Sequence, residues 1–353
     1  MDRTFLIYHL IAILSSSVAA LFLYRMKEQR SVMRTMLLGI IVLFGLALTA
    51  IFFPVDGFAR VQLLAWGAFL YFPIFLLMGI LFFWDHNRRL AVGLAVLFLI
   101  TLLIAGDSFL IEPHWLKTTR IEIRSSKIDQ PLTVAVLADI QTDSPGDYEK
   151  NVLEIVEGSN PDLILLAGDY IQVRDLEGYQ RESKALNQIF QEGGLSPRLG
   201  IYAVRGNVDW NIWNEIFMGL DVKTFEETET LDLGPVVLTG LGWLDSADSA
   251  FQVRGEGKYH IVLGHSPNYS LGEIEGDLLL AGHTHGGQVQ LPGIGPLLTL
   301  STVPRKWASG LTEIHPGKFL LVSNGIGLER GNAPRMRFLC RPEVILISLL
   351  PAD

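Results

Sequence analysis

Long apolar stretches separated by short polar ones fill the first third of the chain. Four of them have about the 17 to 25 residues that cross a bilayer core, namely residues 5–24, 36–53, 61–84 and 90–106. The pattern predicts four transmembrane helices, with no ionisable residue in the middle of a span to suggest a transport path. A membrane anchor is the simpler interpretation, and a channel or transporter the alternative. The letters "SSVAA" resemble a signal-peptide cleavage site, but three further spans follow them.

From about residue 111 the pattern changes to short apolar runs that end in polar residues. Five of these runs, rich in Val, Ile and Leu, predict buried strands: "LTVAVLAD", "DLILLAGD", "GIYAVRGN", "YHIVLGH" and "DLLLAGHTH". Amphipathic segments at residues 148–157, 179–191 and 211–220 predict the intervening helices. The runs "HIVL", "FLLVSNGIG" and "VILISLL" suggest a second sheet stacked on the first. We therefore expect a membrane anchor over residues 1–110 and an α/β domain over residues 111–353.

Composition and charge fit this division. The mean hydropathy of +0.34 is high for a soluble protein. The formal net charge is −9, and the first 110 residues hold more Lys and Arg than Asp and Glu, so the second domain is strongly acidic. Such a domain repels nucleic acid and anionic lipid faces unless a metal intervenes, so we expect no nucleic-acid partner. Cys340 is the only cysteine, which excludes an internal disulfide and leaves the redox compartment open.

The basic residues of the loops predict the orientation in a cell membrane. Six lie between spans one and two or between spans three and four, namely Arg25, Lys27, Arg30, Arg34, Arg88 and Arg89. Only Arg3 and Arg60 lie on the other side, so the positive-inside rule places the six in the cytoplasm and the second domain outside. Four basic residues soon after span four, Lys117, Arg120, Arg124 and Lys127, would level the count if they were included.

Each of the five predicted strands ends in a side chain that can bind a metal. In chain order these are Asp139, Asp169, Asn207, His265 and then His283 with His285. Singly, each has an ordinary explanation, such as a turn, a cap or a core histidine. Together they suit divalent ions of the Mn, Fe, Zn or Mg type, because ligands at strand ends converge on one rim of a sheet. The glycines beside the two histidines, Gly282, Gly286 and Gly287, allow close approach of the backbone.

The same residues resemble a known family. The blocks "LADIQTD", "LLAGDY", "VRGNVD", "LGHSP" and "AGHTHGGQ" are similar to the successive D-x-H, G-D-x, G-N-H-[DE], G-H and G-H-x-H signatures of the calcineurin-like metallophosphoesterases. The segments "LIEPHWLKTTRIEI", "QVQLPGIGPLL" and "NGIGLERGNAPRMRFLCRPEVILISL" resemble the membrane-anchored bacterial branch, so the similarity covers about residues 111–350. It implies a four-layer α-β-β-α sandwich and a two-metal phosphohydrolase.

The resemblance also implies a role for each matched residue. Asp139, Asp169 and His285 would hold the first metal, and Asp169, Asn207, His265 and His283 the second, with Asp169 bridging. Gln141 stands where the family has a histidine; it either coordinates through its amide oxygen, which tilts the preference toward Mn or Mg, or points away and leaves water in its place. Val208 replaces a histidine that can protonate the leaving group, so either Asp209 or solvent supplies the proton, or nothing does.

Two classes of function stay open on the sequence alone. One is a hydrolase of a phosphoester or phosphoanhydride, and the other is a catalytically weak domain that binds metal and phosphate as a membrane sensor or scaffold. Arg205, Arg305 and Lys306 are candidate phosphate-binding residues, although basic loop residues are commonly solvated surface. Similar proteins include hydrolases of UDP-2,3-diacylglucosamine, which suggests a lipid-linked substrate. That nucleotide substrate is cytoplasmic, whereas the loop charges place this domain outside.

Overall fold

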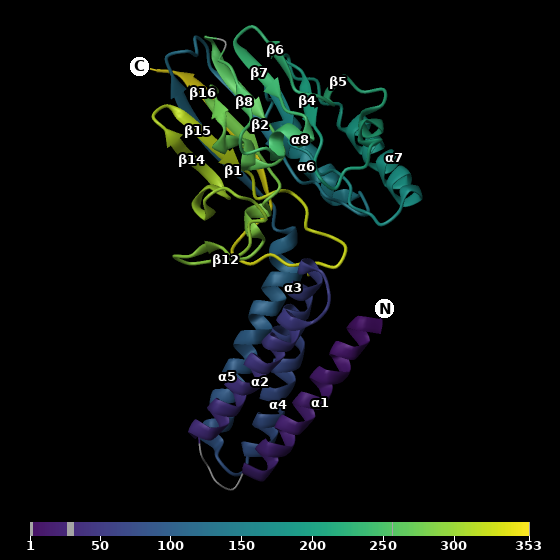
Figure 1. The fold of residues 1–353 in the computed structure, drawn as a ribbon, viewed down its shortest axis with the longest axis vertical. Helices are drawn as coiled ribbons and strands as arrows, with labels where there is room; N and C mark the ends of the chain where they lie inside the picture. The colour runs from purple at the N-terminus through teal and green to yellow at the C-terminus, as the bar shows by residue number, and fades with distance from the viewer. Residues whose placement is uncertain (1–2, 27–31, 256, 353) are drawn as a thin grey trace. The chain divides into compact units, whose positions relative to one another are not determined.

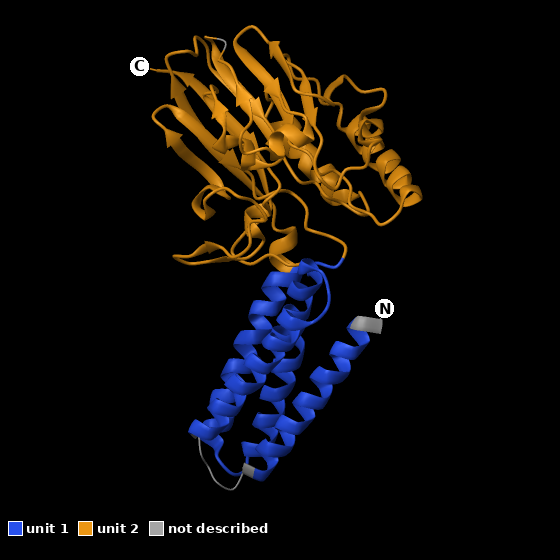
Figure 2. Cartoon of the chain, viewed as in Figure 1, with its two compact units in different colours: residues 1–110, 332–334 blue, residues 111–331, 335–353 orange. Residues whose placement is uncertain are grey.

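The structure is a computed structural model that describes residues 3–26, 32–255 and 257–352. Two compact units make up the chain (Figure 2). One contains residues 1–110 and 332–334, and the other contains residues 111–331 and 335–353. Lys27 and Arg30, which contribute to the predicted orientation, lie outside the described residues.

The first unit consists of long apolar helices. They are α1 (Arg3–Met26), α2 (Val32–Phe52), α3 (Gly57–Trp66) continued by a π-helical turn (Gly67–Tyr71) and α4 (Phe72–Phe83), and α5 (Arg88–Gly106). Among the described residues, four helical segments are long and apolar enough to cross a membrane: Phe5–Arg25, Met33–Phe52, Gly57–Phe83 and Arg88–His114. The four predicted helices are thereby confirmed, and they indicate a membrane protein. The apolar helix α1 contains one histidine, His9, which is a titratable side chain. Its Nδ1 lies 2.6 Å from the Tyr71 hydroxyl.

The second unit contains two six-stranded sheets (Figure 1). The first sheet has the order β1 (Lys117–Ser125), β16 (Glu343–Pro351), β2 (Leu132–Leu137), β3 (Leu163–Leu166), β4 (Ile201–Val204), β5 (Val222–Phe225). The second has the order β14 (Gly310–His315), β15 (Lys318–Val322), β11 (Leu278–Ala281), β9 (Tyr259–Leu263), β7 (Val236–Gly240), β6 (Glu229–Asp232). Within each sheet the central pairs β2–β3–β4 and β9–β11 are parallel, so their carboxyl ends lie at one edge.

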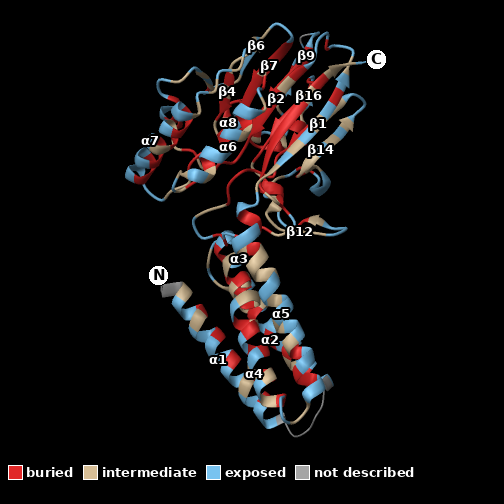
Figure 3. Ribbon diagram, turned by 180° about the vertical axis from the view of Figure 1, so that it is seen from behind, coloured by how far each residue is buried: buried red, intermediate tan, exposed pale blue. Residues whose placement is uncertain are grey.

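The sheets pack face to face and are covered on their outer faces. Val134 and Leu165 from the first sheet share one buried cluster with Ile261 and Leu280 from the second, and Figure 3 shows the central strands as buried. The helices α6 (Asp147–Gly158) and α7 (Leu176–Gly193) cover the first sheet through a second cluster. The second sheet is covered by short elements: α8 (Trp243–Ala247), a 3₁₀ turn (Pro267–Leu271), and the paired strands β8 (Gln252–Val253) and β10 (Glu273–Ile274). The predicted α-β-β-α order is therefore present, with a thin fourth layer.

Two predicted elements differ from the structure. Residues 211–220 form only a 3₁₀ turn (Trp213–Phe217) instead of a helix, and the indole of Trp213 in this turn is fully buried and stacks on Tyr170 with ring centroids 5.8 Å apart. The run "VILISLL" belongs to β16, which pairs antiparallel with β2 and parallel with β1 in the first sheet, not the second. A strand buried on both faces has a continuous apolar run, and that run carries no information about which sheet it joins.

Candidate metal centre

The candidate ligands come together where strands of both sheets end. Asp139, Asp169 and Asn207 follow β2, β3 and β4, while His265 and His283 follow β9 and β11. The loops are joined through their backbones, since the Asp139 N–H donates to the Gly168 carbonyl at 3.0 Å. In the other sheet, the Gly282 N–H donates to the His265 carbonyl at 2.9 Å. The parallel order of neighbouring strands thus places the ends of five separate sequence blocks in one small volume.

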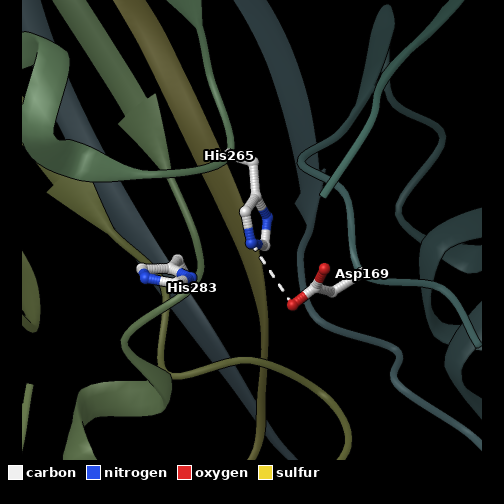
Figure 4. Close-up of side chains that lie close together, drawn as sticks. All are labelled: Asp169, His265 and His283. Carbon is white, nitrogen blue, oxygen red and sulfur yellow. Dashed lines mark ion pairs between the residues drawn. The ribbon is translucent and has the colours of Figure 1, made fainter. Parts of the chain in front are cut away.

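Two groups of ligand atoms lie within this volume and share one carboxylate. Asp169, His265 and His283 offer atoms that lie within 4.8 Å of one another, and so do Asp139, Asp169 and His285. Figure 4 shows His265 and His283 facing the Asp169 carboxylate, with His265 Nε2 3.3 Å from Asp169 Oδ2. A shared carboxylate between two ligand groups is the arrangement that suits two neighbouring cations.

Hydrogen bonds fix the orientation of both imidazoles of the second group. His265 Nδ1 lies 2.7 Å from the Ala167 carbonyl and His283 Nε2 lies 3.2 Å from the Leu300 carbonyl, so these nitrogens carry the protons. The other nitrogens face Asn207 Oδ1 at 3.0 and 2.7 Å, and they offer their lone pairs to a cation once any proton on them is displaced. Three acceptor atoms then face one another, and a cation among them satisfies all three. Bonds from the outer imidazole nitrogen to a carbonyl are typical of metal-binding histidines.

The first group contains buried polar atoms that have no hydrogen-bond partner within the described ranges. These atoms are Asp139 Oδ2, Gln141 Oε1 and both ring nitrogens of His285. Leaving a buried polar atom unpaired costs about 1–3 kcal/mol, and more for a charged one. Four such atoms on three neighbouring candidate ligands are therefore expensive in a protein that binds nothing there. The donor set fits a divalent cation.

The amide of Gln141 is oriented by a network that the sequence did not reveal. Its Nε2 donates to Gln172 Oε1 at 3.0 Å and to Glu329 Oε2 at 3.1 Å. Gln172 Nε2 in turn donates to Glu329 Oε1 at 2.7 Å. Because both acceptors hold the amide nitrogen, the buried amide oxygen is left free to act as a metal ligand. This favours coordination by Gln141 over the alternative in which the side chain points away.

Electrostatics within the site follow from burial. Burial raises the pKa of Asp139 to about 7. Burial alone would also raise the pKa of Asp169, but His265 and the Val208 N–H outweigh it and lower that pKa. For His265 burial lowers the pKa, yet Asp169 and Asp139 outweigh it and raise the pKa to about 9. Burial and His265 lower the pKa of His283 to about 4, and burial with Arg337 lowers the pKa of His285 well below its ordinary value. Both histidines are thus neutral and able to bind a metal.

The backbone of the site is strained. Five of the seven candidate ligands have positive φ: Asp139 (51°), Gln141 (39°), Asp169 (56°), His283 (68°) and His285 (49°). Such angles are uncommon outside glycine and concentrate at functional sites. Close packing keeps them in place. A Cβ on Gly206 would lie 2.0 Å from Asp169 Oδ1, so only glycine permits this approach.

Asp209 and the candidate basic residues are not part of either group of ligand atoms. The Asp209 carboxylate is 2% exposed and accepts the backbone N–H groups of Asp169, Tyr170 and Gly206 at 2.8–2.9 Å. Burial, followed by Asp169, raises its pKa to about 6. Arg205 donates to the Asp209 carbonyl at 2.8 Å.

Arg305 and Lys306 line an open pocket of about 700 Å³ whose lining includes none of the candidate ligands.

Trp243 is a residue of the site that the sequence analysis did not predict, and its ring centroid lies 5.6 Å from that of His265. Trp243 and Gln172 lie outside the recognised blocks, Glu329 lies within the quoted segment that begins at Asn324, and no spacing rule marks any of the three.

Comparison with known proteins agrees with the geometry. Residues 132–287 match the family model described as calcineurin-like phosphoesterase. The chain therefore contains a calcineurin-like metallophosphoesterase domain. It is 26% identical to an uncharacterized metallophosphoesterase of Aquifex aeolicus over 71% of this chain and 97% of that protein. It is 27% identical to the uncharacterized metallophosphoesterase YkoQ of Bacillus subtilis (64% and 90%) and 25% identical to the phosphodiesterase YaeI of Escherichia coli (68% and 90%).

Family membership defines the class of reaction. The family uses divalent metals, and this metallophosphoesterase is a hydrolase that acts on phosphoester bonds. The candidate ligand groups of the structure lie in or just beside the matched blocks, since Asp139, Asp169 and His285 all fall within residues 132–287.

The shared carboxylate generates the first prediction. Asp169→Asn keeps the acceptor for the Val208 N–H but removes the charge common to both ligand groups. We expect the purified full chain to lose both metals, measured by elemental analysis after gel filtration, and to lose hydrolysis together with them. Asp129→Asn, on an exposed carboxylate, is the matched control. A variant that retains two tightly bound metals contradicts the assignment.

The network around Gln141 generates a second prediction. Glu329→Ala removes one of the two acceptors that hold the Gln141 amide nitrogen, which frees the amide to rotate. We expect the affinity of the first metal to fall roughly 10- to 100-fold, as for other groups that orient ligands, while the second metal binds as before. Calorimetric titration of the metal-stripped full chain separates the two binding steps. Glu227→Ala, on an exposed side chain, is the control, and equal weakening of both steps counts against this role.

Proposed function

We propose that this metallophosphoesterase binds two divalent ions and hydrolyses a phosphodiester or phosphoanhydride. Asp139, Gln141, Asp169 and His285 hold the first ion, and Asp169, Asn207, His265 and His283 hold the second. The observation that carries the proposal is the pair of ligand groups that share Asp169. Two such ions, when bound, would acidify a water and neutralise the phosphoryl oxygens. Mn²⁺ is the favoured ion because Gln141 offers a neutral oxygen, with Mg, Fe and Zn as the other candidates.

The chain's own residues position these groups. The Asp169 carboxylate is held through Oδ1 by the Val208 N–H at 3.0 Å. His265 and His283 each keep one nitrogen directed inward because the other donates to a carbonyl. We assign Asp209 to positioning instead of proton transfer, because its buried carboxylate already accepts three backbone N–H groups. Trp243, beside both imidazole rings, restricts their movement.

A lipid-linked substrate is the finer part of the proposal. It is supported by the four membrane-spanning candidates and by an open pocket of about 500 Å³. The pocket is lined by the apolar side chains of Leu176, Val208, Trp210 and Ile212 together with Asp209 and Asn211. UDP-2,3-diacylglucosamine is one candidate substrate through the sequence resemblance. The charges of the loops favour a catalytic domain on the outer side of the membrane. On that side the candidate substrates are a phospholipid, an undecaprenyl phosphoester or a cell-wall phosphoester.

A diester assay tests the enzyme against the sensor or scaffold alternative. The alternative rests on Val208, which cannot transfer a proton. We expect the detergent-solubilised full chain with Mn²⁺ to cleave bis-p-nitrophenyl phosphate, and Asp139→Asn to abolish the cleavage. Failure with Mn²⁺, Co²⁺, Mg²⁺ and Zn²⁺, in a protein that still binds two metals, supports the sensor or scaffold.

The position of Val208 also predicts a dependence on the leaving group. General acid catalysis contributes roughly 10² to 10⁴ in rate, and neither Val208 nor the occupied Asp209 carboxylate supplies it. We therefore expect aryl diesters and phosphoanhydrides to be cleaved much faster than alkyl diesters, and Val208→His to raise chiefly the alkyl rate. Rates across leaving groups of graded pKa measure this.

Asp209→Asn serves as the matched comparison for that series. If Asp209 only positions the loops, the variant lowers the rates of aryl and alkyl substrates by the same factor. A selective loss of the alkyl rate identifies Asp209 as the proton donor. A wild-type rate that does not change with leaving-group pKa shows that a proton donor is present and contradicts the prediction.

A further inference from the structure

Several large apolar side chains are exposed close to the metal centre. Ile294, Leu297, Leu298, Leu300 and Leu339 are each 41–60% exposed, and we call them the apolar rim. Single exposed leucines need no explanation, but a group of five beside a functional site indicates a contact surface.

The backbone of this segment explains why its side chains face outward. The Leu297 N–H donates to the Val289 carbonyl at 3.1 Å, and the Leu300 carbonyl accepts from His283 Nε2. The Leu298 carbonyl oxygen lies 2.5 Å from the place where a Cβ on Gly287 would stand. The backbone is therefore packed on the turn that carries His283 and His285. The turn leaves no room for the leucine side chains, which extend to the surface.

Two cations lie beside the apolar rim. Arg305 and Lys306 line the pocket of about 700 Å³ together with Ile294 and Leu339, and none of its lining residues in the described chain is acidic. Arg305 and Lys306 are both exposed. In a strongly acidic domain this is a local exception. Apolar side chains next to basic ones match the boundary between lipid phosphates and acyl chains.

One residue of the apolar rim, Leu339, contacts Glu112, which lies at the carboxyl end of a candidate span and belongs to the same compact unit. The candidate span Arg88–His114 contains Glu112, which is 4% exposed and accepts the Leu339 N–H at 2.8 Å and the Cys340 N–H. Leu339 therefore lies beside the last turn of that span. Trp115, the next residue after the span, is 55% exposed and carries the Arg341 guanidinium 4.0 Å from its ring centre. An exposed tryptophan at a span end, with an arginine beside it, is typical of the membrane interface.

We propose that the apolar rim docks into the headgroup region of the bilayer, with Arg305 and Lys306 bound to lipid phosphate. Because the Leu300 carbonyl contacts His283, the docked surface brings the metal centre to the depth of the lipid phosphates. The surface thus selects a phosphoester in a lipid headgroup as substrate, a step that rests on the proposed function. The docking itself does not depend on catalysis.

Depth-dependent quenching tests the docking without measuring activity. Leu298→Cys is labelled with an environment-sensitive fluorophore in the full chain, reconstituted in nanodiscs that contain phosphatidylglycerol and a lipid with a nitroxide near its headgroup. Leu244→Cys, 78% exposed on α8, is the matched control, and Cys340 is only 2% exposed and so remains unlabelled under mild conditions. We expect quenching several-fold stronger at position 298 than at position 244. Equal quenching overturns the proposal.

Two further arms separate the possible occupants. Shielding of the label in lipid-free detergent that increases with protein concentration indicates a second copy of the chain and overturns bilayer docking. Arg305→Gln with Lys306→Gln is expected to remove the dependence of quenching on the phosphatidylglycerol fraction. Quenching that keeps this dependence in the double variant shows that these side chains do not bind lipid phosphate.

Discussion

The burial of two neighbouring carboxylates, Asp139 and Asp169, is the constraint on which the rest of the site depends. Both side chains are almost fully buried, and each raises the electrostatic cost of ionising the other. The surroundings compensate with His265, with backbone N–H groups and with a donor set that suits cations. The unpaired atoms of His285 and Gln141 belong to the same pattern, because a cation that stabilises the carboxylates also satisfies them.

The two-sheet core makes this burial possible. Strands β2 and β3 end beside each other in one sheet, and β9 and β11 do so in the other, so short loops from both meet at one edge. The loops then approach so closely that the ligands adopt strained backbone angles, and glycines such as Gly206 and Gly282 occupy positions where a Cβ would strike a carboxylate oxygen. The large apolar core stabilises the strained loops, which is how functional sites retain such strain.

Two departures from the family pattern alter different parts of the chemistry. Gln141 preserves an oxygen donor, and Glu329 with Gln172 controls which end of the amide faces the site. Val208 stands where the family pattern has a possible proton donor and adds an apolar side chain to the lining of a pocket. On the proposed function, metal binding would be retained while proton supply is reduced, which would restrict efficient cleavage to substrates with a good leaving group.

The sequence by itself determined the four apolar spans, the order of the strands that carry ligands, and the candidate ligands from Asp139 to His285, because apolar periodicity and residue type are local properties. It assigned "VILISLL" to the wrong sheet and expected a helix where Trp213 is buried, because pairing partners and packing are not encoded locally. Only the tertiary structure revealed the contact of Glu329 with Gln141 across 188 positions and the occupied carboxylate of Asp209. Hydrogen bonds between residues far apart in the chain form only after the two sheets bring their loops together, so no spacing in the sequence predicts them.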